Sequence, residues 1–369
     1  MRVLLLTPGP LTTADRTRAA MDRDWGSRDG DFVAMSERVR DRLLALSGAD
    51  AVTHVAVPVQ GSGTFAVEAA VQTLVPQNGT LLVLANGAYG RRISEIARRL
   101  GRTVAVLEVA ENQAIEPADL DRALAANPAV TDVAVVHLET TSGLVNRLEA
   151  VAAAVHAHGR RLLVDAIGSF GALPMPKLLP FAAMVGSANK GLEGVPGLAF
   201  VVAERDHLAA SAGNASSLSL DLHAQWQGFE RDGQWRFTPP THAVAALDAA
   251  LDQLDEEGGV AARSARYRRN STVLIDGMRA LGFTPYLPAS LQGPVIVTFR
   301  VPPDTWFDFE SLYGFLHERG VVIYPGKLTA EPSFRIGCIG AVSEADMRRT
   351  LSLIGEFVAA RRPAQAVAN

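Results

Sequence analysis

Two ionisable residues follow apolar segments that are typical of buried strands, and they are the first candidates for chemistry. Asp165 lies near the end of RRLLVDA, and Lys190 follows FAAMVGSA, 25 residues later (190 minus 165). A buried carboxylate is stable when a cation or a protonated nitrogen pairs with it, although Asp165 could instead cap the turn that follows. A lysine at the mouth of a buried strand loses solvation, which lowers its pKa and makes its amine a nucleophile and a base.

A glycine-rich segment could bind an anion. The segment GSGTF, which contains Ser62, Gly63 and Thr64, follows the strand-like residues 55–59 and opens an apolar helix. Glycines allow a tight turn, and a helix N-terminus offers unpaired N–H groups beside the two hydroxyls. The same residues could also form a simple turn with a threonine cap.

Aromatic and hydroxyl side chains follow two further strand-like segments. Tyr89 lies in NGAYG after LLVLA, where its ring could cover a flat ligand or pack in a turn. In HLETTSGLVN, the hydroxyls of Thr140, Thr141 and Ser142 could bind a ring substituent or cap a helix. In open α/β sheets, ligands bind beyond the carboxyl ends of the strands, so residues that follow strands have the greatest weight.

A late arginine could hold an acidic substrate. Arg335 lies in SFRIGCIG among small and apolar residues, and its planar guanidinium matches a carboxylate or a phosphonate. Lys327, in the preceding YPGKL, is a secondary candidate for an anion contact. Together, the candidates require a phosphate, a flat ring, a basic ring nitrogen and an aldehyde. Pyridoxal 5'-phosphate has all four groups, so the sequence predicts an enzyme that uses this cofactor.

The elements that position these residues alternate between β-branched strands and alanine-rich helices from about residue 50 to 200, which is typical of βαβ units around a mainly parallel sheet. The predicted strands are 81–84, 133–138, 161–164, 182–187 and 198–203, and the predicted helices are 65–74, 90–100, 117–126 and 148–158. Residues 204–242 show a weaker, polar pattern. Two long helices follow, at 243–254 and 260–281, and then strands at 295–301, 321–324 and 333–338 with helices at 309–318 and 343–359.

This pattern predicts two domains. We expect a large cofactor-binding domain over residues 1–260 and a smaller α+β domain over residues 261–369, with residues 1–20 packing toward the small domain.

Composition excludes several classes of protein. With 369 residues, 48% of them hydrophobic, the chain has enough apolar residues for a large folded core. The formal net charge of -4 gives no general attraction to nucleic acid or to anionic lipid. Cys338 is the only cysteine, so no intramolecular disulfide can form, and a reducing cytoplasm is expected. His156 and His158 point to different sides of a predicted helix, so no metal site is expected.

The motifs together resemble the class V aminotransferases. The resemblance covers nearly the whole chain and rests on LTPGPLTT, QGSGTF, NGAYG, ETTSG, VDAIGSFG, SSLSLDL, WRFTPPTH, VIYPGKL and FRIGCIG. It implies an α/β fold of the aspartate aminotransferase type (fold type I), with a mainly parallel seven-stranded sheet and a smaller C-terminal domain.

The resemblance also implies a role for each site residue. Lys190 would be the lysine that bonds covalently to the cofactor, Asp165 would pair with the ring nitrogen, and Arg335 would bind the acid group of the substrate. The other cofactor contacts implied are Tyr89 and Ile167 on the two ring faces, Thr140 or Thr141 at the ring hydroxyl, and Ser62, Gly63, Thr64 and Asn189 at the phosphate. Thr238 would reach the phosphate from a second subunit, which implies a homodimer.

The implied reaction moves the amino group of 2-aminoethylphosphonate to pyruvate, giving phosphonoacetaldehyde and L-alanine in phosphonate catabolism. Nearby alternatives are transamination of alanine or serine with glyoxylate, and a pyridoxal phosphate lyase acting on a hydroxylated aminophosphonate. A nicotinamide-dependent oxidoreductase would explain the βαβ pattern, but it would not explain Lys190 and Asp165. The expected partners are therefore small-molecule substrates and a second copy of the chain, with no nucleic acid and no membrane.

Overall fold

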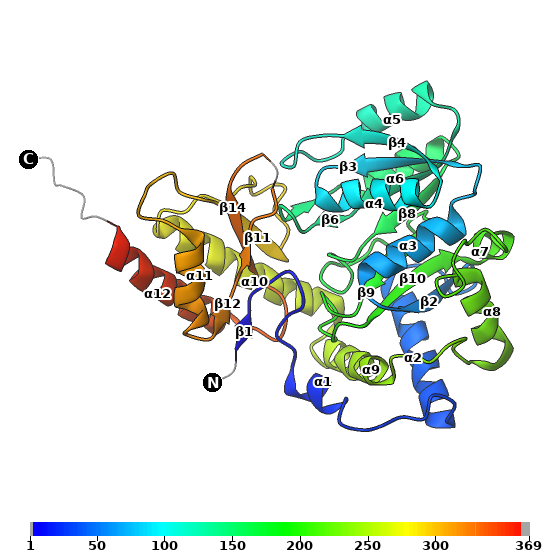
Figure 1. The fold of residues 1–369 in the computed structure, drawn as a ribbon, viewed down its shortest axis with the longest axis horizontal. Coiled ribbons are helices and arrows are strands. Elements are labelled where there is room, and N and C mark those ends of the chain that lie inside the picture. Colours follow the sequence, from blue (N-terminus) through cyan, green and yellow to red (C-terminus); the bar gives the residue numbers. More distant parts are fainter. Residues whose placement is uncertain (1–2, 329, 363–369) are drawn as a thin grey trace, which may run out of the picture.

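A seven-stranded sheet in which all strands but β10 run parallel forms the centre of the molecule (Figure 1). The structure is a computed structural model that describes residues 3–328 and 330–362. In spatial order, the strands are β2 (His54–Gln60), β10 (Leu198–Glu204), β9 (Ala183–Ser187), β8 (Arg161–Asp165), β5 (Val130–Val136), β3 (Thr80–Ala85) and β4 (Thr103–Glu108). The parallel strands therefore end at the same edge of the sheet.

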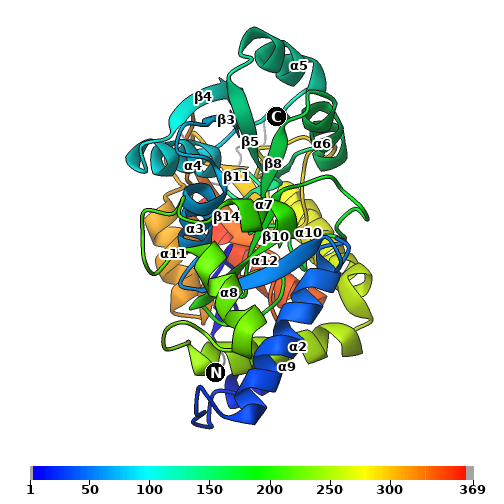
Figure 2. The same ribbon diagram turned by 90° about the vertical axis from the view of Figure 1, so that its right-hand side faces the viewer.

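Helices cover both faces of this sheet, because alternate residues of each strand point to opposite faces. In β5, Val133 and Val135 belong to one apolar core, whereas Ala134 and Val136 belong to the other. The first core includes α2 (Gly30–Leu46), α5 (Pro117–Ala126), α6 (Leu148–Ala157) and α9 (Thr241–Glu256). The second includes α3 (Gly63–Leu74), α4 (Ala88–Arg99), α7 (Arg205–Ala210) and α8 (Leu222–Asp232). Figure 2 shows α3 and α4 on one side of the sheet and α2 and α6 on the other.

A smaller unit lies beside the large sheet (Figure 1). Its antiparallel sheet has the order β11 (Ile296–Arg300), β14 (Ser333–Gly337) and β13 (Tyr324–Pro325). A third apolar core joins this sheet to α11 (Phe309–His317), α12 (Glu344–Arg361) and the end of α10 (Gly259–Ala280). Near the N-terminus, β1 (Leu4–Leu5) pairs in parallel with β12 (Val321–Val322). The helix α10 contacts α9 of the large unit as well as α12 of the small one, so these contacts do not separate the two units at residue 260. The domain limits therefore stay a prediction.

Two predicted strands are divided in the structure. The segment predicted over 133–138 leaves the large sheet after β5, and β6 (Leu138–Glu139) pairs instead with β7 (Leu144–Val145). The segment predicted over 321–324 splits because β12 pairs with β1 whereas β13 pairs with β14. Hydrophobic pattern alone does not reveal a change of partner, so each segment looked continuous.

Several elements were not predicted, namely the short strands β1 and β7, the edge strand β4 and the helices α1 (Asp15–Ala19), α2, α7 and α8. The edge strand β4 is only partly buried, so its apolar pattern is weak. The helix α8 lies in the polar region 204–242, but its start had a signal. The carboxylate of Asp221 accepts a hydrogen bond from Ala224 N at 3.0 Å, which is an ordinary N-cap. Among the described residues, no helix is long and apolar enough to cross a membrane.

A close backbone approach fixes the turn that follows β9. A Cβ atom on Gly191 would lie 2.5 Å from Phe170 O and closer still to Ala172 N. These are backbone atoms of another loop, so they cannot rotate away. Only glycine fits here without a shift of one loop against the other.

We predict that Gly191→Ala destabilises the protein by about 1–3 kcal/mol, because the added methyl group overpacks two fixed segments. The measurement is the free energy of unfolding in urea. The matched control is Gly314→Ala, since Gly314 lies within α11 and an added Cβ would meet nothing within 4 Å. Alanine should leave that helix unchanged or more stable. Equal effects of the two substitutions would contradict the prediction.

Candidate active site

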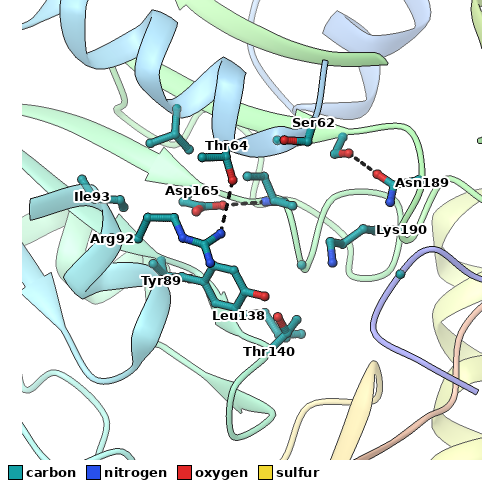
Figure 3. A pocket seen from close by; sticks show the side chains of 17 residues that line it. Ser62, Thr64, Tyr89, Arg92, Ile93, Leu138, Thr140, Asp165, Asn189 and Lys190 are labelled. Atoms are coloured by element: carbon teal, nitrogen blue, oxygen red, sulfur yellow. Dashed lines mark hydrogen bonds between the residues drawn. The ribbon is translucent and has the colours of Figure 1, made fainter. Parts of the chain in front are cut away.

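A single cavity at the carboxyl edge of the large sheet collects most of the predicted site residues. Figure 3 shows their side chains around a common space. The predicted residues that line it are Ser62, Gly63, Thr64, Tyr89, Thr140, Asp165, Ile167, Asn189 and Lys190. They come from the ends of β2, β3, β6, β8 and β9 and from the helix starts that follow. Thr141, Thr238 and Arg335 are not in this lining.

Lys190 follows β9, and its amine points into the cavity (Figure 3). Its Nζ donates a hydrogen bond to Pro8 O at 2.5 Å, so the N-terminal loop closes one side of the site. Burial lowers the pKa of Lys190, and the positive charges of Arg335 and Lys327 lower it further. The lowered pKa increases the fraction of neutral amine, which is the form that attacks a carbonyl or accepts a proton.

Asp165 is the last residue of β8 and has 6% of its surface exposed. Its Oδ1 accepts a hydrogen bond from Ile167 N at 2.9 Å. Burial raises the pKa of Asp165 to about 7, and the negative charge of Glu139 contributes in the same direction. No ion pair among the described residues involves this carboxyl group, so a positively charged group in the cavity would stabilise its ionised form.

The segment from Ser62 to Thr64 forms the start of α3, where unpaired N–H groups face the cavity. A Cβ atom on Gly63 would lie 2.5 Å from Ile167 Cδ1, so glycine allows Ile167 to lie against the helix start. Arg92 donates from Nη1 to Thr64 Oγ1 at 3.2 Å. A helix start, a hydroxyl and a guanidinium together suit an anion such as phosphate.

Asn189 extends this polar wall from the other side of the cavity (Figure 3). Its Oδ1 accepts a hydrogen bond from Ser187 Oγ at 2.5 Å, which leaves the amide nitrogen as the donor of this side chain.

Tyr89 has positive charges on several sides. The guanidinium of Arg92 lies 4.8 Å from the centre of its ring, and Lys327 Nζ lies 4.6 Å from it. Its hydroxyl interacts electrostatically with Thr140 and with Arg335. Burial alone raises the pKa of Tyr89, but the charges of Lys190 and Lys327 and the interaction with Thr140 lower it overall.

The two candidate threonines point to different partners. Thr140 lines the cavity, whereas the hydroxyl of Thr141 is hydrogen-bonded to the buried Glu139 and accepts from Ala88 N at 3.3 Å. Glu139 also accepts from Tyr89 N and Thr141 N, both at 3.1 Å. Burial raises the pKa of Glu139. Glu139 thus fixes the start of α4, and with it the backbone of Tyr89.

Arg335 and Thr238 lie outside the cavity lining in different ways. Arg335 lies behind Tyr89 and Thr140, because its Nη1 donates to Thr140 O and its Nε to Pro325 O, both at 3.0 Å. A guanidinium has five N–H donors, so others remain for a ligand. Thr238 is exposed and lines a separate hollow with Ser27 and Arg28, so it does not reach the cavity of its own chain.

Sequence reasoning missed Arg92, Glu139 and the contact of Pro8 with Lys190. Arg92 follows Tyr89 by three residues, and this helical spacing places both on one face of α4, which was a usable signal. Glu139 stood inside the motif that identified Thr140, but nothing local shows that it is buried. The Pro8 contact joins residues 182 positions apart, so no local pattern could reveal it.

The arrangement can hold a flat ligand with an anionic group at the start of α3 and a cationic ring nitrogen at Asp165. An aldehyde on that ligand would meet the amine of Lys190. In the described ranges 3–328 and 330–362, no group of three or more His, Cys, Asp or Glu residues is arranged to hold a metal ion.

Comparison with known sequences identifies relatives over nearly the whole chain. Residues 15–347 match the family model of Aminotransferase class-V. A 2-aminoethylphosphonate–pyruvate transaminase 2 from Burkholderia lata is 52% identical, with 97% of this chain and 95% of that protein covered. A 2-aminoethylphosphonate–pyruvate transaminase from Pseudomonas putida is 51% identical, with 96% of each chain covered.

Solved structures show the same fold. The pyridoxamine-pyruvate aminotransferase of Mesorhizobium loti is 28% identical and superposes with a TM-score of 0.89, with 98% of this chain and 93% of that one covered. An alanine–glyoxylate aminotransferase from Nostoc sp. has a TM-score of 0.89 at 22% identity, with 97% and 96% covered, and at that identity it supports the fold alone. The predicted fold type I architecture is confirmed.

We predict that Asp165 makes the cofactor-free protein less stable as the pH rises. The unfolded carboxyl releases its proton near pH 4, whereas the folded one keeps it to about pH 7 because of burial. The contribution of Asp165 to the free energy of unfolding is therefore fully present below pH 4 and is lost as the pH rises through 7.

The side chain of the variant Asp165→Asn cannot ionise, so the variant should not lose stability in this way as the pH rises. Its advantage over wild type in free energy of unfolding should grow by about 1–3 kcal/mol between pH 5 and pH 8. Urea unfolding of both cofactor-free proteins at the two pH values measures the difference. The same pH dependence in both would show that the carboxyl ionises freely in the folded state.

Proposed function

This chain belongs to the class V aminotransferase family, and from that premise we propose that it transfers the amino group of 2-aminoethylphosphonate to pyruvate. The products are phosphonoacetaldehyde and L-alanine, so the amino group and the carbonyl oxygen exchange places between the two carbon skeletons. The relatives named 2-aminoethylphosphonate–pyruvate transaminase are 51–52% identical over 96–97% of the chain, and they support this pair of substrates. The observation that supports it most is the concentration of cations, Arg92, Arg335 and Lys327, around one cavity. Two anionic partners, a cofactor and an acidic substrate, would balance that charge.

The residues of the cavity fit pyridoxal phosphate as the cofactor. The observation that tests this fit is Asp165, a buried carboxyl group aimed into the cavity with a pKa raised by burial. A protonated ring nitrogen is the partner that such a group needs. The start of α3 from Ser62 to Thr64, with Asn189, suits the phosphate.

Four further residues would hold the ring and its aldehyde. Tyr89 and Ile167 both line the cavity and would enclose the ring, and Thr140, the threonine that faces the cavity, would contact the ring hydroxyl. Lys190 would form the covalent bond to the aldehyde. When bound, the cofactor supplies a carbonyl carbon for the amino group and a ring that takes up electrons when the substrate loses a proton.

The protein's own groups then move and hold protons. The amine of the substrate would take the place of Lys190 on the cofactor, which frees the Lys190 Nζ. The neutral Nζ would then take a proton from the amine-bearing carbon of the substrate, because its lowered pKa leaves it able to accept one. The ionised carboxylate of Asp165 holds positive charge beside it, which stabilises the negative charge that develops on the reacting carbon. Arg335 binds the acid group of either substrate through its planar fork.

A panel of half-reactions tests the proposed substrates. The loaded enzyme should lose its yellow absorbance with 2-aminoethylphosphonate, and pyruvate should restore it. Alanine should also remove the absorbance, since it is the reverse donor. Serine or alanine reacting best with glyoxylate as acceptor would favour the glyoxylate alternative. Turnover of a hydroxylated aminophosphonate without any 2-oxo acid would favour a lyase. Family membership disagrees with the nicotinamide-dependent alternative.

We further propose that two chains share each active site. Phe65 and Phe237 are 50% and 48% exposed and line one hollow beside the phosphate-binding turn. Burying such rings against a second chain would remove apolar surface from water. Thr238 follows Phe237 directly, so a second chain seated here would bring its own Thr238 toward the phosphate of the first.

Subunit mixing tests this assembly. Lys190→Ala and Thr238→Ala homodimers should each have low activity, because every site has a lesion. In a mixed dimer, one site has both lesions and the other has neither, so mixing should restore activity above either parent. Size-exclusion chromatography of two differently tagged chains verifies the exchange. Unchanged activity after verified exchange, or a fully active monomer, would exclude shared sites.

A further inference from the structure

Two cations near the cavity come from one hairpin of the small unit. Arg335 lies in β14 opposite Tyr324 of β13, and its Nε donates to Pro325 O at 3.0 Å. The hairpin is closed by the bond from Gly326 N to Ser333 O at 2.8 Å. Lys327 follows Gly326 directly, so its backbone continues from residues that are hydrogen-bonded to Arg335 and its strand. The two cations are therefore presented from neighbouring positions of one hairpin.

Both cations lie near Tyr89, which lines the cavity. The Nζ atom of Lys327 lies 4.6 Å from the centre of the Tyr89 ring, and Arg335 interacts electrostatically with Tyr89 and donates from Nη1 to the backbone oxygen of Thr140 at 3.0 Å. The charge of Lys327 also reaches the amine of Lys190, whose pKa it helps to lower. None of the ion pairs between residues of the described ranges involves Lys327, so its charge has no carboxylate partner there.

The third cation, Arg92, also lies beside Tyr89, 4.8 Å from the centre of its ring, but its guanidinium is already hydrogen-bonded to the start of α3. It donates to Thr64 Oγ1 at 3.2 Å, at the helix start that suits the phosphate of the cofactor. The acid group of the substrate is therefore left with the cations of the hairpin.

The two substrates differ in what they require there. A carboxylate such as that of pyruvate has one negative charge and two oxygens in a plane, which the fork of one arginine can match. A phosphonate resembles a phosphate, with three acceptor oxygens in a tetrahedral arrangement and up to two negative charges. One planar fork leaves its third oxygen and part of its charge without a partner. A compact ammonium group on a flexible stem can supply that contact.

We propose that Lys327 is a specificity-determining residue that binds the phosphonate group together with Arg335, whereas the carboxylate of pyruvate depends on Arg335 alone. The inference rests on the proposed function, because it assigns the substrate group that this part of the site recognises. It also explains why this hairpin bears two cations when a carboxylate substrate needs one.

The test measures kcat/KM of each half-reaction separately in Lys327→Met, which keeps the apolar stem and removes the charge. We expect kcat/KM for 2-aminoethylphosphonate to fall about 10- to 100-fold, as the loss of one hydrogen bond to a charged group predicts. The value for pyruvate should change by less than about threefold, since its carboxylate keeps Arg335. The pyruvate half-reaction also reports that the variant is folded and binds cofactor.

Two further variants make the result specific. Lys177→Met removes the charge of an exposed lysine distant in sequence from the hairpin, and it should change neither half-reaction. Lys327→Arg restores a positive charge and should recover most of the lost aminophosphonate activity. Arg335→Lys, in contrast, should weaken both half-reactions.

The outcomes separate the two proposals. If the wild-type enzyme does not react with 2-aminoethylphosphonate, the proposed function fails. If it does react, but Lys327→Met lowers both half-reactions equally or neither of them, the proposed function stands and the role of Lys327 is wrong.

Discussion

Loss of hydration at the carboxyl edge of the large sheet controls the ionisation of both central groups of the site. Burial raises the pKa of Asp165 to about 7 and lowers that of Lys190, so each group is shifted toward its neutral form. The fold causes this directly, because all strands but β10 end at one edge and helices cover both faces of the sheet. A neutral amine beside a carboxyl group that needs a positive partner is the state that the aminotransferase reaction requires. The site is therefore prepared by the layered fold before any ligand binds.

Tyr89 connects the large sheet with the smaller unit. Its backbone is fixed by Glu139 at the start of α4, and its hydroxyl interacts electrostatically with Thr140 and with Arg335. Lys327 lies over its ring. The positive charge around Tyr89 thus comes from two parts of the chain, from Arg92 of α4, which donates to Thr64 at the start of α3, and from the β13–β14 hairpin with Arg335 and Lys327. This arrangement suits two acidic molecules bound side by side.

The loop that follows Lys190 is also attached to the small unit through α10. Glu193 is buried, has a φ of 61°, and accepts hydrogen bonds from Tyr267 Oη at 2.5 Å and from Arg266 Nη2 at 2.7 Å. Arg263 donates to Gly191 O at 3.3 Å. A buried acid is costly unless paired, and these donors offset that cost. The loop that follows Lys190 is consequently held by the helix that leads into the small unit.

The α/β fold class follows from strand and helix periodicity, which is a local property of the sequence. The residue types at strand ends likewise predicted Ser62, Gly63, Thr64, Tyr89, Thr140, Asp165 and Lys190, whereas Ile167 and Asn189 came from the family resemblance. The strand β4 and the helix α8 were missed because their apolar patterns are weak, although the N-cap residue Asp221 was a signal for α8. That Thr140 faces the cavity while Thr141 turns to Glu139, and that Arg92 reaches Thr64, is visible in the three-dimensional structure alone. These assignments depend on burial and on contacts between segments far apart in the chain, which no local pattern records.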